Sequence, residues 1–259
     1  MKQKVSIFAV GLFVGLVVGF IVTNHFNRPE FAVGKPGSAA ANSASTPGGN
    51  ASQGDGPIDP SGGDEAQISD EELQHIKQAV DANPDKYDDQ VMFAEYLLKM
   101  RHDPAAAIAY YERANKLKPN DLKSLVGLAN ATFDAAAPED GTSAYDDDRL
   151  KKATGYYEKA LAIDPKDVNV RTDMALTYFF RTPPETDRAI AEFRRSLAID
   201  PRHQITLQNL TAALTTKGDL QAAEQTLAQL QSVAPGNPAI PQLRADIEKA
   251  RSGQKIPSH

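Results

Sequence analysis

Few residues in this sequence of 259 could carry chemistry, and they are scattered along the chain. Cysteine is absent, which excludes a thiolate nucleophile, a thiolate metal site and a disulfide. None of the five histidines pairs with another histidine or with a carboxylate at metal-ligand spacing. No glycine-rich phosphate loop and no nucleophile elbow occurs. The sequence therefore predicts a protein that is not an enzyme and that uses no cofactor and no metal.

One run of carboxylates stands out, Asp146-Asp147-Asp148 just before Arg149. Clustered carboxylates suit hard cations, but a calcium loop places its ligands at alternating positions and these three are consecutive. The same residues can cap the positive end of a helix that starts here, and this is the favoured interpretation. The segment before the helix, residues 135–146, is an insertion whose role, as a binding loop or otherwise, the sequence leaves open.

One sequence pattern repeats along the chain. The segment at 156–165, YYEKALAIDP, returns in altered form at 110–119, 192–201 and 226–235. In each copy, apolar residues recur at steps of three and four, which places them on one face of a helix. The closing proline cannot continue a helix and ends each unit. The base period is about 34 residues, with insertions.

This pattern resembles the tetratricopeptide repeat, in which each unit is a pair of antiparallel helices. The small residues of the first helix are Ala94, Ala129, Ala175 and Thr211. The alanines that open the second helix are Ala107, Ala153, Ala189 and Ala223. The large residues behind them are Tyr111, Tyr157, Phe193 and Leu227. The tryptophan of the family is missing, and its places are taken by Val91, Leu125, Arg171 and Leu207.

The resemblance implies an all-α fold, a right-handed superhelical array of antiparallel helix pairs over residues 66–251. Ser69 and Glu72 predict a capping box at the start of the first helix. The expected repeats are 88–121, 122–167, 168–203 and 204–237, with capping helices at 69–82 and 238–251 and a tail at 252–259. The expected paired helices are 87–101 with 104–117, 121–134 with 147–163, 167–181 with 185–199, and 203–217 with 219–233.

Residues 5–23 are uncharged and almost wholly apolar. A helix of this length spans about 28 Å, close to the thickness of a bilayer core. Lys2 and Lys4 precede it, so the positive-inside rule places residues 1–4 in the cytoplasm. The stretch is long for a cleaved signal peptide, and no small-x-small site follows it directly, so an uncleaved anchor is favoured. We expect a single-pass protein of the inner (cytoplasmic) membrane whose repeat domain faces the periplasm or the cell exterior.

Gly11, Gly15 and Gly19 lie four residues apart and so share one face of this anchor. Small residues at that spacing let two helix backbones approach, which would support a homodimer or contact with another membrane helix. Glycine is also common in membrane helices in general, so both interpretations stay open. Residues 24–65 are rich in Gly, Ser, Ala and Pro and cannot bury enough apolar surface to fold, which predicts a flexible linker.

The resemblance also implies where a partner binds, because first helices line the concave face of such arrays. The residues carried over by register are Met92, Tyr96, Lys99, Met100, Lys123, Val126, Asn130, Phe133, Asn169, Thr172, Leu176, Phe179, Phe180, Gln208 and Ala212. Only Lys123 and Asn130 match the basic clamp with which chaperone-associated members hold a C-terminal carboxylate. An apolar groove of this kind suits an amphipathic helix or a hydrophobic peptide. At least one of the adjacent Phe179 and Phe180 is expected in the core.

The net charge of −6, with no basic block, argues against a nucleic-acid partner. A single anchor followed by a repeat array resembles the interaction subunits of bacterial cytochrome c maturation, which hold apocytochrome for haem attachment. The predicted function is therefore a membrane-anchored scaffold for protein–protein interaction outside the cytoplasm. Two alternatives remain: an envelope assembly factor in secretion, pilus or outer-membrane biogenesis, and a non-catalytic subunit of a membrane enzyme complex.

Overall fold

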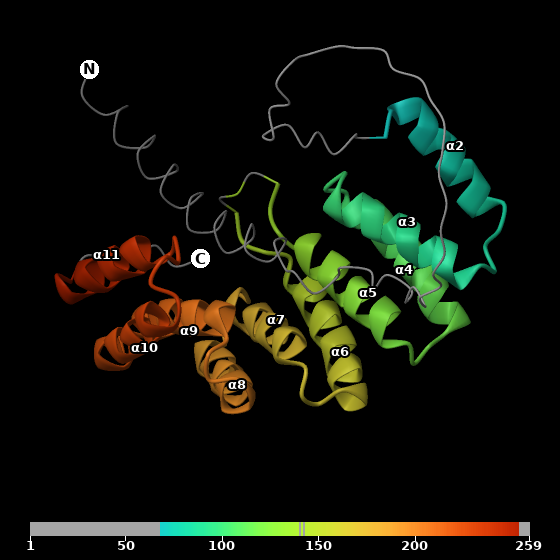
Figure 1. Cartoon of the computed structure of the whole chain (residues 1–259). Helices are drawn as coiled ribbons and strands as arrows, with labels where there is room; N and C mark the ends of the chain where they lie inside the picture. The colour runs from blue at the N-terminus through green and yellow to red at the C-terminus, as the bar shows by residue number, and fades with distance from the viewer. Residues whose placement is uncertain (1–67, 140, 142, 254–259) are drawn as a thin grey trace, which may run out of the picture.

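The computed structural model describes residues 68–139, 141 and 143–253, and within these it contains helices and no strand (Figure 1). The helices are α2 (Asp70–Asp81), α3 (Tyr87–Lys99), α4 (Pro104–Leu117), α5 (Leu122–Asp134), α6 (Asp147–Ile163), α7 (Val168–Phe179), α8 (Thr186–Ile199), α9 (Gln204–Lys217), α10 (Leu220–Val233) and α11 (Ile240–Arg251). Consecutive helices pack against each other along the array, so the architecture is a helical solenoid.

Every helix expected from residue 69 onward is present, with ends that differ by at most two residues. The helix α3 ends early because the N–H groups of Met100 and Arg101 both donate to the carbonyl of Tyr96. His102 then takes a left-handed conformation with φ 50°, which turns the chain into α4.

Among the residues described, no helix is long and apolar enough to cross a membrane. The expected anchor at 5–23, its glycine face, the linker at 24–65 and most of the tail lie outside the described residues. They stay predictions from the sequence.

Side-chain caps fix the starts of α2, α4, α5, α6, α7 and α10. The capping box is confirmed: the N–H of Glu72 donates to the hydroxyl of Ser69 at 3.2 Å, and the N–H of Ser69 donates to the Glu72 carboxylate at 3.0 Å. Asp103, Asp121, Asp167 and Asp219 accept backbone N–H groups in the same way at later helices. The turn before Asp219 uses Gly218 at φ 85°, a conformation that glycine adopts without strain.

The small residues of the repeat pattern lie where helices cross. The exposed fraction is 0% for each of these residues: Ala94, Ala129, Ala175, Thr211, Ala107, Ala153, Ala189 and Ala223. Short side chains let two helix backbones approach closely, and the neighbouring large side chains, such as Tyr157 and Phe193, fill the space between them. This packing explains why the sequence repeats these residue types at fixed positions.

Arg171 stands in place of one of the missing tryptophans and forms polar contacts there. Its guanidinium donates to the carbonyl of Pro165 at 2.8 Å and forms an ion pair with Glu192 at 3.1 Å. Glu192 is 7% exposed and also pairs with Arg195 at 2.6 Å. A charged cluster therefore joins α7 to α8 at a position where the family pattern places an aromatic ring.

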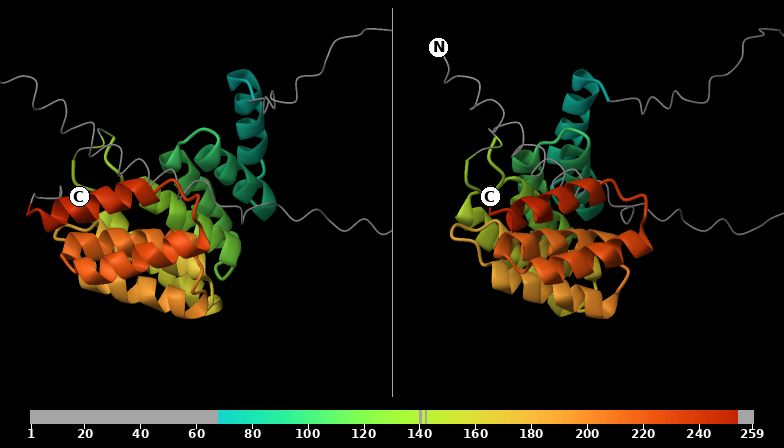
Figure 2. Two further views of the ribbon diagram at one scale, coloured as in Figure 1. Left: turned by 60° about the vertical axis from the view of Figure 1, so that its left-hand side comes forward. Right: turned by 90° about the vertical axis from the view of Figure 1, so that its left-hand side faces the viewer.

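The helix α2 stands at one end of the array and rises steeply from the neighbouring helices, as Figure 2 shows from two directions. Asp81 near its C-terminal end ties it to α4. The Asp81 carboxylate accepts hydrogen bonds from Lys77 and Arg113, both at 2.6 Å, and from the hydroxyl of Tyr110 at 3.2 Å. The hydrogen bonds from Lys77 and Arg113 lower the pKa of Asp81 to about 2.

Candidate functional site

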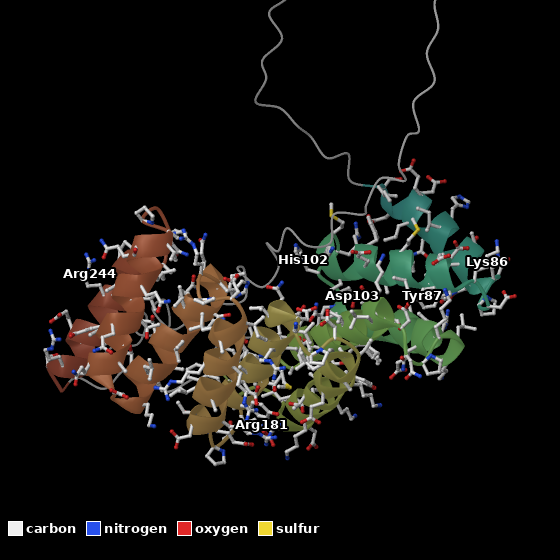
Figure 3. All side chains as sticks on the ribbon, turned by 60° about the horizontal axis from the view of Figure 1, so that its bottom comes forward. Lys86, Tyr87, His102, Asp103, Arg181 and Arg244 are labelled. Carbon is white, nitrogen blue, oxygen red and sulfur yellow. The ribbon has the colours of Figure 1, made fainter. Side chains whose placement is uncertain are left out.

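An apolar cleft of about 290 Å³ lies between α2 and α3, and we call it the α2–α3 cleft. Its lining residues are Ile68, Ile76, Val80, Asp89, Met92, Phe93 and Tyr96. Figure 3 marks the two ends of α3, with Lys86 and Tyr87 at one end and His102 and Asp103 at the other. The α3 residues recur at steps of three and four, so they form one face of that helix.

Large apolar side chains remain open to solvent in this cleft. Met92 is 66% exposed and Ile76 is 38% exposed, whereas Phe93 at 4% and Val80 at 7% form the base. Single exposed apolar residues are common on protein surfaces, but several that share one concavity mark an interaction site. The cleft is therefore a candidate binding surface.

The two helices are held apart at a fixed spacing by contacts at each end. Near the C-terminal end of α2, the side-chain amide of Gln90 donates to the carbonyls of Val80 at 3.2 Å and Asn83 at 3.3 Å. At the other end, Arg101 forms an ion pair with Asp70 at 2.6 Å. The buried amide of Gln90 is the stronger of the two contacts, because the Asp70 side chain is 83% exposed and its ion pair is open to solvent.

A polar cluster on α3 and α5 adjoins the cleft. The Glu95 carboxylate pairs with Lys99 at 2.7 Å and with Lys123 at 3.4 Å. The side-chain carbonyl of Asn130 accepts a hydrogen bond from the Tyr157 hydroxyl at 2.8 Å. A carboxylate of this chain thus already occupies the place between the two lysines, which does not suit the capture of a second carboxylate there.

The structure places some of the predicted groove residues at the surface and buries most of the others. Met92 and Tyr96 line the α2–α3 cleft, Met100 is 37% exposed at the end of α3, and Asn169 is half-buried at the start of α7. Lys99 and Lys123 lie in the adjoining polar cluster. The others, apart from the half-buried Ala212, are 9% exposed or less: Val126, Asn130, Phe133, Thr172, Leu176, Phe179, Phe180 and Gln208. In this arrangement those side chains offer a ligand almost no surface.

The insertion at 135–146 explains part of this burial. Tyr145, which is 7% exposed, stacks on Phe180 with ring centroids 4.4 Å apart and lies 6.3 Å from Phe133. The N–H of Asp146 donates to the carbonyl of Ala136 at 2.9 Å, which closes the loop onto α5. At least one of Phe179 and Phe180 was expected in the core, and both are buried there, with exposed fractions of 2% and 3%.

Thr172 is buried for a different reason. Its exposed fraction is 0%, and its hydroxyl shares a hydrogen bond of 2.6 Å with the hydroxyl of Thr206 on α9. It also donates to the carbonyl of Val168 at 2.7 Å. The side chain therefore joins consecutive repeats, and a bulky residue here would disturb the packing of α7 on α9.

The carboxylates before α6 form a helix cap, as the sequence indicated. Asp146 accepts the N–H groups of Asp148 and Arg149, both at 3.1 Å, and Asp147 pairs with Lys151 at 2.7 Å. The hydrogen bond from Lys151 lowers the pKa of Asp147. Within the described ranges, no group of three or more His, Asp or Glu side chains could hold a metal ion.

Sequence reasoning missed the α2 side of the cleft, because α2 was expected only to cap the array. A signal was present. Leu73, Ile76 and Val80 lie at i, i+3 and i+7 and so share one face of α2, and Ile68 packs against the same core cluster. Ile76 nevertheless stays 38% exposed, so the core does not cover this apolar face completely.

A family model described as a tetratricopeptide repeat matches residues 185–247. Three solved structures share the architecture at low sequence identity. MamA from Desulfovibrio magneticus RS-1 is 15% identical with a TM-score of 0.54, over 65% of this chain and 86% of that one. The described chain has the tetratricopeptide repeat fold.

The other two structures lead to the same conclusion. The tetratricopeptide repeat protein TTC0263 from Thermus thermophilus is 20% identical with a TM-score of 0.50, over 70% of this chain and 89% of that one. PilW, a type IV pilus biogenesis factor, is 19% identical with a TM-score of 0.56, over 71% of this chain and 78% of that one. At these identities the likeness concerns the fold. No curated protein matches the sequence.

Proposed function

We propose that this protein is a membrane-anchored tetratricopeptide scaffold that holds an apolar segment of a client protein outside the cytoplasm. The observation that carries the proposal is the open α2–α3 cleft, in which Met92 leaves two-thirds of its surface in solvent. Covering such a surface removes apolar area from water at about 25 cal/mol per Å², which is a direct source of binding energy. The repeat fold supports it, since stacked repeats present extended binding surfaces.

The proposed placement rests on the N-terminal sequence. Residues 5–23 would anchor the chain in the inner membrane, and residues 24–65 would tether the repeat domain about 35 Å from it on average. The domain then faces the periplasm or the cell exterior, and the face formed by Gly11, Gly15 and Gly19 would pair two anchors or join another membrane helix. This arrangement suits clients that are themselves translocated or membrane-bound.

Two kinds of client fit this arrangement. The first is an apocytochrome c during maturation, following the resemblance in architecture to the interaction subunits of that pathway. The second is a component of an envelope assembly, such as a pilus, secretion or outer-membrane system. The structural likeness to PilW, with its TM-score of 0.56, favours the second on the fold level. A third kind of client is a subunit of a membrane enzyme complex in which this chain is non-catalytic, and it would bind in the same cleft.

Photocrosslinking in living cells tests the scaffold. A photoreactive residue in place of Met92 is expected to trap one dominant protein that resides outside the cytoplasm or in the membrane. The matched control carries the same residue at Ile163, which is 46% exposed on the distant helix α6. The same adducts from both positions, or none from Met92, would contradict a dedicated client. A dominant cytoplasmic adduct would contradict the placement. The trapped protein distinguishes the pathways.

A further inference from the structure

We infer that the α2–α3 cleft selects one class of client segment, an amphipathic helix with lysine or arginine beside its apolar face. This inference rests on the proposed function and names the ligand for it. It draws on the length of the apolar lining, the charge of the two helices that form the cleft, and the position of one carboxylate within the lining.

The lining matches a helical ligand in length and spacing. On α3 it runs from Asp89 to Tyr96, about two helical turns or 10 Å. A ligand helix lying along the cleft presents side chains at i, i+3 or i+4, and i+7 over the same distance. Met92 at the centre is flexible and polarizable, so it adapts to leucine, isoleucine or phenylalanine anchors.

The two helices of the cleft are the acidic end of the described array. Their carboxylates are Asp70, Glu71, Glu72, Asp81, Asp88, Asp89 and Glu95, against the two lysines Lys77 and Lys99. Over the rest of the described chain, from residue 103 to residue 253, acidic and basic side chains nearly balance. A basic ligand is therefore drawn to this end of the molecule more than to the rest of the array.

Among the described residues that line the cleft, Asp89 is the one that carries a charge. It forms an ion pair with Lys86 at 3.9 Å, and these two side chains are 44% and 60% exposed. An exposed pair of this kind contributes little, so a cation of the ligand can take the place of Lys86. Three other carboxylates of the two helices have closer partners: Asp81 pairs with Arg113 at 2.6 Å, Glu95 with Lys99 at 2.7 Å, and Asp70 with Arg101 at 2.6 Å.

Two synthetic helical peptides of about 15 residues test the inference on the full-length chain. Both carry leucine at i, i+4 and i+7, and they differ only in flanking residues, which are lysine in one and glutamate in the other. The lysine peptide is expected to bind at least about fivefold more tightly. The substitution Asp89→Lys is expected to remove or invert this preference, and Met92→Gln, which adds no charge, is expected to weaken the lysine peptide about tenfold.

The control is Glu158→Lys on α6, an exposed position that changes the net charge of the chain by the same amount. An equal loss of preference in Glu158→Lys and Asp89→Lys would show a general charge effect and overturn the inference. So would equal binding of the two peptides to the wild type. If Met92 traps a client in cells while the peptides show no preference, the scaffold stands and only the choice of a basic helix fails.

Other occupants give different results. If a second copy of this chain covers the cleft, sedimentation of the full-length protein will show a dimer that Met92→Glu dissociates. If residues 1–67 of the same chain cover it, the adduct from Met92 will lie within one chain. Either result would overturn the inference that a client helix is the ligand. A monomer that binds the lysine peptide at Met92 supports it.

Discussion

Replacing Gly127 by alanine is expected to destabilise the N-terminal repeats by at least about 2 kcal/mol. Gly127 lies within α5 and faces the ring of Tyr111 on α4. A Cβ atom at this position would stand closer than 3.0 Å to three atoms of that ring. Tyr111 is 4% exposed and tightly packed, so its ring cannot move away without disturbing the crossing of the two helices. The melting temperature of the full-length chain measures the effect.

The matched control is Gly155→Ala in the interior of α6, where a Cβ atom would meet nothing within 4 Å. Alanine favours the helix over glycine, so this variant is expected to gain up to about 1 kcal/mol. The same chemical change should thus have opposite signs at the two sites. A stable Gly127→Ala protein would mean that α4 and α5 do not pack as closely as described.

Truncating Tyr145 to alanine is expected to cost about 3 kcal/mol, the second large effect. The ring fills the space beside Phe133 and Phe180, and alanine would leave a cavity there. Thermal unfolding of the full-length chain measures the loss. The result tests whether the insertion at 135–146 is part of the core.

Tyr145→Phe is the control, because it keeps the ring and removes only the hydroxyl. That hydroxyl is buried and, in the part of the chain described, has no hydrogen-bond partner. Removing it is expected to leave the stability unchanged or raise it slightly. No loss of stability in the alanine variant would show that the ring is not packed against Phe133 and Phe180 as described. A loss in the phenylalanine variant would show instead that the hydroxyl has a hydrogen-bond partner.

The fold followed from the sequence because its determinants are local and repeated. The prolines that end each unit, the aspartates that cap the next helix and the alanines at crossings such as Ala107 and Ala153 each act within one helix pair. Such signals can be identified in the sequence without knowledge of the tertiary structure. The register they give also placed Met92 and Tyr96 on an accessible face of α3.

The rest of the site depended on contacts between residues distant in sequence. The register placed Phe180 in the groove, but it could not show that Tyr145 would stack on it. It placed Thr172 there too, but not the hydrogen bond to Thr206 that buries it. The contacts of α2 with α4 include the hydrogen bonds from Arg113 and Tyr110 to Asp81, which no periodic pattern indicates. Local patterns thus predict helices and cores better than they predict which surface stays open.

Hydrogen–deuterium exchange of the full-length chain, with and without the client trapped at Met92, tests the central claim most directly. Binding in the α2–α3 cleft predicts slower exchange in α2 and α3, with exchange in α9 to α11 unchanged. Slower exchange confined to α5 and α7, or to the C-terminal helices, with α2 and α3 unaffected, would contradict the claim that this cleft is the working surface of the protein.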